Sequence, residues 1–327
     1  MRILIAGAGA IGGYIGACMT RAGQDVTLFA RGAHLKAMQE RGLRVLSADG
    51  DFEVKPNVIG DLNQAGAVDV IILGVKAHGL TQLAPQLKPL IGESTVIVST
   101  QNGIPWWYFQ IGSGEHTGLH LESVDPGGVV ASSIDPQKVI GSLVYLGTEI
   151  PEPGVIRHTE GNRISLGEPD GTRSDRIKQI AGLLIQAGLR APVTTRIHHE
   201  IFVKLLGNGA FNPISALTRA TLVRIVHDPH AAALVRSMMA EVEMVANKLG
   251  IELPVTIDQR MAGAEKVGEH KTSMLQDLEA GRPMELEPVV GSVVELGDRL
   301  GIAMPHTRSV YACAKLLGAM EMEKRNQ

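Results

Sequence analysis

The chain has few cysteines. Cys18 and Cys313 are the only two, and they form neither a Cys-x-x-Cys pair nor a plausible framework of disulfide bonds. A small secreted fold held together by disulfides is therefore excluded. Two isolated thiols suit a reducing compartment, so we expect a cytoplasmic protein.

The sequence also lacks a large excess of either charge. Its 31 basic and 34 acidic residues give a formal net charge of −3 at pH 7, and no basic cluster stands out. Because nucleic-acid-binding domains are usually strongly basic on one face, we expect no nucleic-acid partner. Metal-ligand motifs are scarce too. His198 and His199 are adjacent and would point to different faces of a helix, and no His-Glu-x-x-His pattern occurs, so we expect no metal site.

Long apolar runs are missing with one apparent exception, at the N-terminus. There Met1 and Arg2 precede seventeen mostly apolar residues, which imitates a signal peptide or a membrane span. Five glycines interrupt this run, however, and their spacing has a different meaning. We therefore expect a soluble protein without a membrane partner.

Glycine is what this N-terminal stretch has in abundance. Residues Ile3 to Ala6 predict a short buried strand, Gly7-Ala8-Gly9-Ala10-Ile11-Gly12 follows, and a helix-compatible segment runs to about Ala22 before a second strand, Asp25 to Phe29. This order fits the G-x-G-x-x-G fingerprint of dinucleotide-binding folds, in which the glycines permit the turn, the approach of the pyrophosphate and close packing. The phosphates would bind at the helix N-terminus. An ordinary glycine-rich turn is the alternative.

The end of the second strand indicates which dinucleotide binds. NAD-selective sites usually place Asp or Glu there to bind the ribose 2′-hydroxyl, but this chain has Arg31. A guanidinium can bind a 2′-phosphate through charge-assisted hydrogen bonds, whereas a carboxylate would repel it. We therefore predict NADP (NADPH) as the cofactor. The alternative is that Arg31 is a solvated surface arginine.

Two more apolar runs extend the predicted sheet. They cover Val68 to Val75 and Ser94 to Ser99, and such runs are typical of parallel strands buried on both faces. Lys76 follows the first run and Asn102 lies shortly after the second. Because ligands of open α/β sheets bind beyond the carboxyl ends of the strands, both residues are candidates for the cofactor or substrate site.

The second half of the chain has a helical pattern, and at 327 residues the chain is long enough for two domains. We predict an N-terminal Rossmann-type domain with a doubly wound sheet, residues 1–194, followed by an all-α domain, residues 195–327. The elements expected beyond the first sheet segments are strands at 139–148 and 162–167, a turn at 151–154, and helices at 174–187, 228–250, 284–300 and 306–322.

One of the helical segments is unusually polar. Lys204, Asn208 and Asn212 are spaced i, i+4, i+8, so a helix places all three on one face. Asn and Gly are poor helix formers, which suggests that this face is kept for a purpose other than stability. A solvated helix face is the alternative interpretation.

Several separated motifs resemble the ketopantoate reductase (2-dehydropantoate 2-reductase) family over nearly the whole length. They are GAGAIG near the start, VKA at 75–77, QNG at 101–103, KLLGNGAFNPISAL at 204–217, SMLQD at 273–277, GRPMELE at 281–287 and GIAMPHT at 301–307. The resemblance implies an NADPH-dependent oxidoreductase that reduces 2-dehydropantoate to (R)-pantoate in pantothenate and coenzyme A biosynthesis. It also implies an N-terminal Rossmann domain that binds the cofactor and a C-terminal helical domain.

The resemblance also implies roles for individual residues. Lys204 matches the family's catalytic lysine and Glu285 its active-site glutamate, while Lys76 matches a lysine of the cofactor site. Four polar residues match substrate-binding positions, namely Asn102, Asn208, Asn212 and Ser273, and Asn102 is also expected beside the cofactor. A cationic side chain near the keto oxygen would stabilise the charge that develops on it and supply a proton.

Departures from the family pattern leave the substrate open. His270 and Val290 stand where the family usually has asparagines, and the stretches 106–109 and 121–137 are unusual, the first for four consecutive aromatics that we expect to pack in the core or to wall a pocket. A paralogue that reduces a bulkier 2-keto acid is one alternative. A nucleotide sensor without turnover is another, although it would not need both Lys204 and Glu285. The sequence does not decide whether the chain forms a homodimer.

Overall fold

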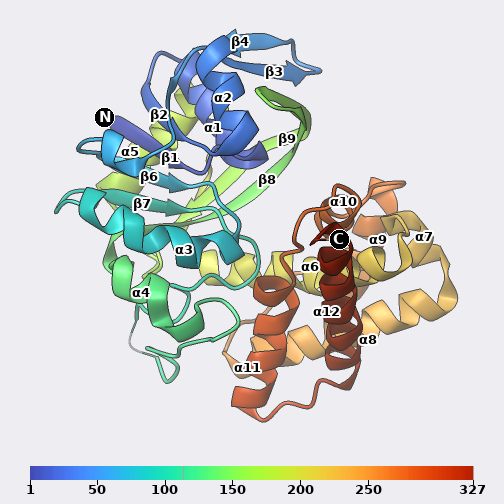
Figure 1. The fold of residues 1–327 in the computed structure, drawn as a ribbon. Coiled ribbons are helices and arrows are strands. Elements are labelled where there is room, and N and C mark those ends of the chain that lie inside the picture. The colour runs from blue at the N-terminus through green and yellow to red at the C-terminus, as the bar shows by residue number, and fades with distance from the viewer. Residues whose placement is uncertain (113, 327) are drawn as a thin grey trace. The chain divides into compact units, whose positions relative to one another are not determined.

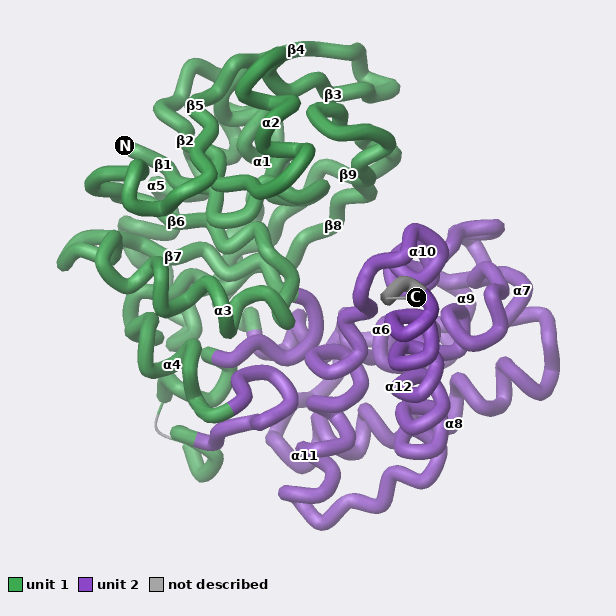
Figure 2. Tube along the Cα trace, viewed as in Figure 1, with its two compact units in different colours: residues 1–101, 107–118, 127–197 green, residues 102–106, 119–126, 198–327 purple. Residues whose placement is uncertain are grey.

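The computed structural model describes residues 1–112 and 114–326, with side chains to Lys324. The chain forms two compact units (Figure 2). Unit 1 contains residues 1–101, 107–118 and 127–197, and unit 2 contains residues 102–106, 119–126 and 198–327. Unit 1 contains most of residues 1–194, for which the sequence predicts a Rossmann-type domain, and unit 2 contains most of residues 195–327, for which it predicts a helical one.

In the described residues, unit 1 is built on a mixed sheet of ten strands (Figure 1). Nine of them follow the order β4-β3-β9-β8-β7-β6-β1-β2-β5, and the tenth, β10, pairs with β9. The strands are β1 (Arg2–Ala6), β2 (Asp25–Phe29), β3 (Leu43–Ser47), β4 (Phe52–Val54), β5 (Asn57–Ile59), β6 (Val70–Leu73), β7 (Val96–Ser99), β8 (Val139–Glu152), β9 (Val155–Gly167) and β10 (Val193–Thr194). The predicted strands at the N-terminus are thus confirmed in position and order.

The middle of the sheet is parallel and buried on both faces. Strand β1 pairs in parallel with β2 and β6, and β6 with β7. Ile3 and Ile5 belong to one apolar core together with residues of the helices of unit 1, whereas Leu4 between them is equally buried but points to the other face. Burial on both faces explains why these strands are continuous apolar runs in the sequence.

An antiparallel hairpin, β8–β9, extends the sheet. Its turn contains Pro153 and Gly154, and Gly154 has φ +84°. Both strands are longer than the sequence pattern predicts. The outer part of β8 is only partly buried, and most of the outer part of β9 is exposed, so neither has a continuous apolar pattern there.

The helices of unit 1 are α1 (Ala10–Arg21), α2 (Gly32–Arg41), α3 (Ala77–Leu87), α4 (Val129–Ser133) and α5 (Asp175–Gln186), with short 3₁₀ turns at η1 (Leu62–Gln64), η2 (Lys88–Leu90), η3 (Pro126–Gly128, whose first residue lies in unit 2) and η4 (Pro136–Lys138). The predicted helix at 174–187 is confirmed, since Ser174 caps α5 by accepting the Ile177 N–H. The aromatic residues Trp107, Tyr108 and Phe109 are buried in this unit, and burial raises the pKa of Tyr108.

The described part of unit 2 contains no strands. Its helices are α6 (Ile197–Thr218, whose first residue lies in unit 1), α7 (Leu222–His227), α8 (Pro229–Lys248), α9 (Ile257–Val267), α10 (Ser273–Glu279), α11 (Ser292–Leu300) and α12 (Pro305–Asn326), and η5 (Glu287–Gly291) is a π-helical turn directly before α11. The predicted helix at 228–250 is confirmed by Asp228, whose carboxylate caps α8. No helix in the described residues is long and apolar enough to cross a membrane.

The two-domain division at residue 194 stays a prediction, and the structure adds a detail to it. Two short segments from the first half of the chain, 102–106 and 119–126, belong to unit 2. Ile104 N–H donates to the Pro288 carbonyl at 3.0 Å, and Glu295 accepts the N–H groups of Glu122 and Ser123 at 3.0 and 2.9 Å. These bonds attach both segments to the helices of unit 2.

Candidate functional site

The glycine-rich loop of unit 1 has the close packing expected of a dinucleotide-binding turn. Gly7 has φ +112°, and a side chain there would collide with Val75. A side chain at Gly12 would collide with the Gly7 carbonyl, and one at Gly74 would collide with the same oxygen. The loop and the end of β6 therefore touch backbone to backbone, which only glycine allows.

The N-terminus of α1 is open to an anion. Gly9 is the N-cap residue without a side-chain cap, and Gly13 N–H makes the first helical bond, to the Gly9 carbonyl at 2.7 Å. The amides of Ala10, Ile11 and Gly12 therefore have no acceptor within the helix. Such amides, together with the helix dipole, favour a phosphate group.

Arg31 lies at the same edge of the sheet as this loop. Ala8 N–H donates to the Phe29 carbonyl at 2.8 Å, and Arg31 follows two residues later as the N-cap of α2. Its side chain is exposed, and its guanidinium lies 5.3 Å from the centre of the Phe29 ring. The position beyond the carboxyl end of β2 is where the 2′-substituent of an adenosine ribose is bound in Rossmann folds.

Lys76 is the N-cap residue of α3 and partly buried. It follows β6 by three residues, directly after the segment that packs on the glycine-rich loop. The structure thus places Gly7, Gly12, Arg31 and Lys76 at one edge of the sheet in unit 1, as the sequence predicts.

His34 is a residue of this edge that sequence reasoning missed. Its Nδ1 accepts the Gly154 N–H at 3.0 Å, and its ring lies against the Ala8 backbone carbonyl. Burial lowers the pKa of His34, and the Ala8 carbonyl opposes this only in part. The neutral imidazole connects α2, the glycine-rich loop and the β8–β9 turn.

In unit 2, three of the predicted site residues form a chain of hydrogen bonds. Lys204 Nζ donates to Asn102 Oδ1 at 2.8 Å, and Asn102 Nδ2 donates to Glu285 Oε2 at 3.2 Å. All three side chains are partly buried. The arrangement fixes the amide of Asn102, because its oxygen faces an ammonium and its nitrogen faces a carboxylate.

The segments that carry Asn102 and Glu285 are in close backbone contact. Gly103 has φ +78° and packs so closely on the Pro288 carbonyl that a side chain would collide with it. Pro288 belongs to the π-helical turn η5, which begins two residues after Glu285. π-Helical turns occur frequently at functional sites. The Asn-Gly pair at 102–103 was the available sequence signal for this contact.

The remaining predicted substrate residues differ in exposure. Asn208 is partly buried one turn after Lys204 on α6, whereas Asn212 is only 6% exposed. Ser273 is exposed at the start of α10, directly after the N-cap residue Thr272. A ligand beside Lys204 would therefore meet Asn208 more readily than Asn212.

The two residues that depart from the family pattern, Val290 and His270, also differ in exposure. Val290 is completely buried in η5 and is part of the core, while His270 is partly buried and its backbone bonds to Leu222 and Gly268. Of the two, only His270 has surface left to contact a ligand. The described residues contain no group of His, Cys, Asp and Glu side chains that could hold a metal ion.

Comparison with known proteins identifies the family. Residues 3–171 match the family model of ketopantoate reductase PanE/ApbA, and residues 196–318 match that of the ketopantoate reductase PanE/ApbA C terminal. The chain belongs to the ketopantoate reductase family. The resemblance seen in the sequence motifs is thereby confirmed, as is a Rossmann-type fold followed by a helical one.

Individual members of the ketopantoate reductase family support this assignment. A 2-dehydropantoate 2-reductase from Mesorhizobium japonicum is 49% identical over 97% of this chain and 98% of its own length. The 2-dehydropantoate 2-reductase from Archaeoglobus fulgidus is 31% identical over 92% of each chain. The solved structure of 2-dehydropantoate 2-reductase from Methylococcus capsulatus has a TM-score of 0.83 at 31% identity and 98% coverage of both chains.

A solved structure with a different name has the same fold. D-Mandelate dehydrogenase, solved with NADH and anilino(oxo)acetate, has a TM-score of 0.84 at 22% identity, with 98% of this chain and 99% of that chain covered. At this identity the similarity shows the fold alone.

Proposed function

We propose that this protein reduces 2-dehydropantoate to (R)-pantoate with NADPH, a step of pantothenate and coenzyme A biosynthesis. The observation that carries the proposal is the hydrogen-bonded set Lys204–Asn102–Glu285 in unit 2. The relative that is 49% identical and named for this activity supports the choice of substrate.

The chemistry needs one hydride and one proton. A nicotinamide cofactor, when bound, would supply the hydride for C2 of the keto acid, and the protein must provide a proton for the C2 oxygen so that it becomes a hydroxyl. Lys204 Nζ is the proton donor in our proposal, because an ammonium within hydrogen-bonding distance also stabilises the negative charge that develops on that oxygen.

Asn102 and Glu285 hold and orient this donor. The Asn102 carbonyl oxygen accepts from Lys204, which keeps the ammonium at a fixed position. Glu285 holds the Asn102 amide from its other side and is a hydrogen-bond acceptor for a substrate hydroxyl. Asn208 and Ser273 are donors for the substrate carboxylate.

The preference for NADP over NAD rests on Arg31. Its exposed guanidinium stands beyond β2, where NAD-selective folds carry an acidic residue. Lys76 and the amides at the start of α1 would bind the phosphates that both dinucleotides share.

One observation favours a second substrate. His270 replaces a family asparagine and has surface available, so a bulkier 2-keto acid is the alternative. The test is turnover of a panel of 2-keto acids, followed at the absorbance of NADPH. We expect ketopantoate to have the highest kcat/KM. A bulkier acid with a higher kcat/KM would favour the alternative, and cofactor binding without any turnover would indicate a nucleotide sensor.

Two finer expectations complete the proposal. Both cysteines are free thiols, which supports a location in the cytoplasm. The helix α12 exposes Leu316 and Met320, which lie one turn apart on one face, and an exposed apolar pair of this kind is one that a second copy can cover in a homodimer.

A further inference from the structure

The face of α6 that carries Lys204 has a different neighbour on each side. At about 100° per residue, Gly207 lies roughly 60° to one side of Lys204 and Gly209 roughly 140° to the other. Gly209 faces α8 and η5, since an added Cβ would lie 3.6 Å from Val242 Cγ2 and 3.8 Å from the Val289 carbonyl oxygen. Gly207 instead faces the side chain of Arg260. Lys204 thus stands between the segment that follows Glu285 and a second cationic side chain.

Arg260 lies directly on the backbone of α6. A Cβ built on Gly207 would collide with Nη2 of Arg260 and would lie 2.9 Å from Cζ and 3.2 Å from Nε. The absence of a side chain at Gly207 therefore makes the space that the guanidinium occupies. Arg260 belongs to α9, whose start is fixed by a capping box between Thr256 and Gln259.

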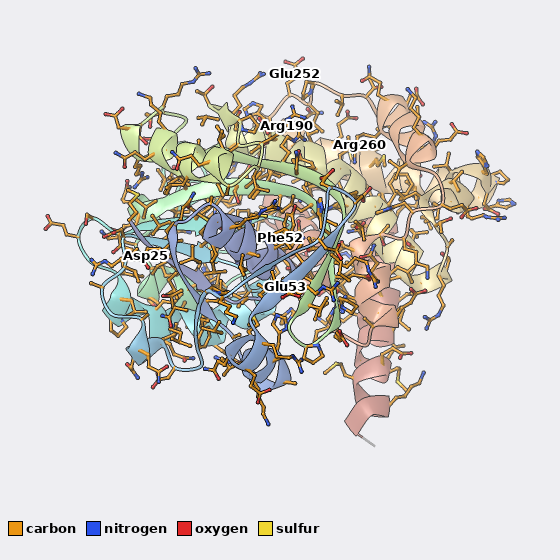
Figure 3. All side chains as sticks on the ribbon, turned by 90° about the horizontal axis from the view of Figure 1, so that it is seen from above. Asp25, Phe52, Glu53, Arg190, Glu252 and Arg260 are labelled. Carbon is orange, nitrogen blue, oxygen red and sulfur yellow. The ribbon has the colours of Figure 1, made fainter. Side chains whose placement is uncertain are left out.

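This placement differs from that of an ordinary surface arginine. Arg260 is partly buried, and its Nε atom is inaccessible to solvent. Arg236 on the neighbouring helix α8 is instead 46% exposed and pairs with Asp258 at 2.5 Å. Figure 3 labels Arg260 among the side chains. A guanidinium that is held partly buried against a helix loses less conformational freedom on binding an anion than an exposed one does.

We propose that Arg260 binds the carboxylate of the 2-keto acid while Lys204 donates to the keto oxygen. The inference rests on the proposed function and names a specificity-determining residue for it. In a 2-keto acid the carboxylate carbon is bonded directly to the carbonyl carbon, so the two side chains that hold these groups must be neighbours. Lys204 lies three residues before Gly207 on α6, and Arg260 packs on Gly207. A planar guanidinium fits a carboxylate through two parallel hydrogen bonds, whereas an ammonium is suited to a single oxygen.

The first test compares Arg260→Gln with wild type and with Arg236→Gln as a matched control. For ketopantoate we expect Arg260→Gln to raise KM by about 10- to 100-fold, the scale of a lost charge-assisted pair. The kcat should change by less than about 3-fold, because Lys204 remains in place. The KM for NADPH should be unchanged, and Arg236→Gln should resemble wild type in every constant. Equal effects of the two substitutions would overturn the proposal.

A substrate without the carboxylate makes the test specific. The lactone of ketopantoate keeps the keto group but is neutral. Arg260→Gln should therefore reduce kcat/KM for the acid and leave that for the lactone within about 3-fold. A similar loss for both substrates would indicate that Arg260 only supports the fold, and the proposal would fail.

Gly207→Ala provides a variant that keeps the charge. The added methyl group would push the flexible end of Arg260 aside, and alanine is the better helix former, so the thermal midpoint should not fall. We expect KM for ketopantoate to rise at least 10-fold in this folded variant. If neither single variant, Gly207→Ala or Arg260→Gln, changed the KM for ketopantoate, the assignment of Arg260 would be rejected. Wild-type protein that turns over no 2-keto acid would instead reject the proposed function itself.

Discussion

Asn102 separates Lys204 from Glu285, with its amide oxygen 2.8 Å from Lys204 Nζ and its amide nitrogen 3.2 Å from Glu285 Oε2. A neutral amide between the two charges holds each in place without letting them form a direct ion pair through this contact. An ammonium carries three N–H donors, and the proposed reduction requires that one of them reaches the keto oxygen of the substrate.

Lys204→Ala should lower kcat by about 10²- to 10⁴-fold, the usual range for a positioned acid. Binding of NADPH should change little, since the phosphate-binding loop belongs to unit 1. Steady-state kinetics and a cofactor titration measure both effects. Lys248→Ala, which removes an exposed lysine of α8, is the control and should be as active as wild type. Near-normal kcat in a folded Lys204→Ala variant would end the assignment of Lys204 as the acid.

The partner Glu285 should behave as part of the same unit. We expect Glu285→Ala to reduce kcat as well, and the double variant Lys204→Ala/Glu285→Ala to lose less than the product of the two single effects. Asn102 connects the two residues, so their contributions are coupled. Strictly multiplicative losses would show that the two residues act independently.

Arg31→Asp should change the cofactor preference. Removing the guanidinium and adding a carboxylate should weaken NADPH binding by roughly 1.5–3 kcal/mol while affecting NADH much less. Dissociation constants from fluorescence titration give both values. Arg41→Asp is the matched control, because Arg41 is an exposed arginine in the last turn of the same helix. A wild-type preference for NADH would contradict the role of Arg31.

His34 should make stability depend on pH. Burial holds the folded-state pKa of His34 below its ordinary value of 6.5, so the unfolded chain binds a proton more readily. The stability contributed by His34 is therefore complete above about pH 6.5 and is lost as pH falls from there towards the folded-state pKa. Protonation would also remove the acceptor for the Gly154 N–H.

Urea unfolding at several pH values between 5 and 8 measures this dependence. His34→Asn is the informative variant, because its side-chain oxygen can still accept the Gly154 N–H but does not titrate. We expect the free energy of unfolding of this variant to vary less between pH 5 and 7 than that of wild type. Identical slopes would mean that other groups cause the dependence.

The two thiols should differ in reactivity. Burial raises the pKa of Cys18 to about 11, although contacts with Tyr14 and Arg21 oppose the shift, whereas Cys313 is exposed. Because the thiolate is the reactive form, a thiol reagent at pH 8 should modify one group in the native protein and two after unfolding. Native Cys313→Ser should react slowly. Rapid modification of Cys18 in that variant would contradict its burial.

The sequence by itself determined the features that depend on near neighbours along the chain. The spacing of Gly7, Gly9 and Gly12 predicts the turn that the structure contains, because each glycine answers a local steric demand. The apolar runs predict the central strands, and the spacing of Lys204 and Asn208 predicts their common helix face. The aromatic run at 106–109 is buried, as expected for packing.

Only the tertiary structure decided which distant residues meet. Asn102 lies 102 positions from Lys204 and 183 from Glu285, and it reaches them because residues 102–106 join unit 2. The contacts of His34 with Gly154 and of Arg260 with Gly207 likewise join separate segments. Periodicity along a chain reports which face of an element is buried, but not against what. The partner is set by how the elements pack, where backbone polar groups must be satisfied and side chains must fit without overlap.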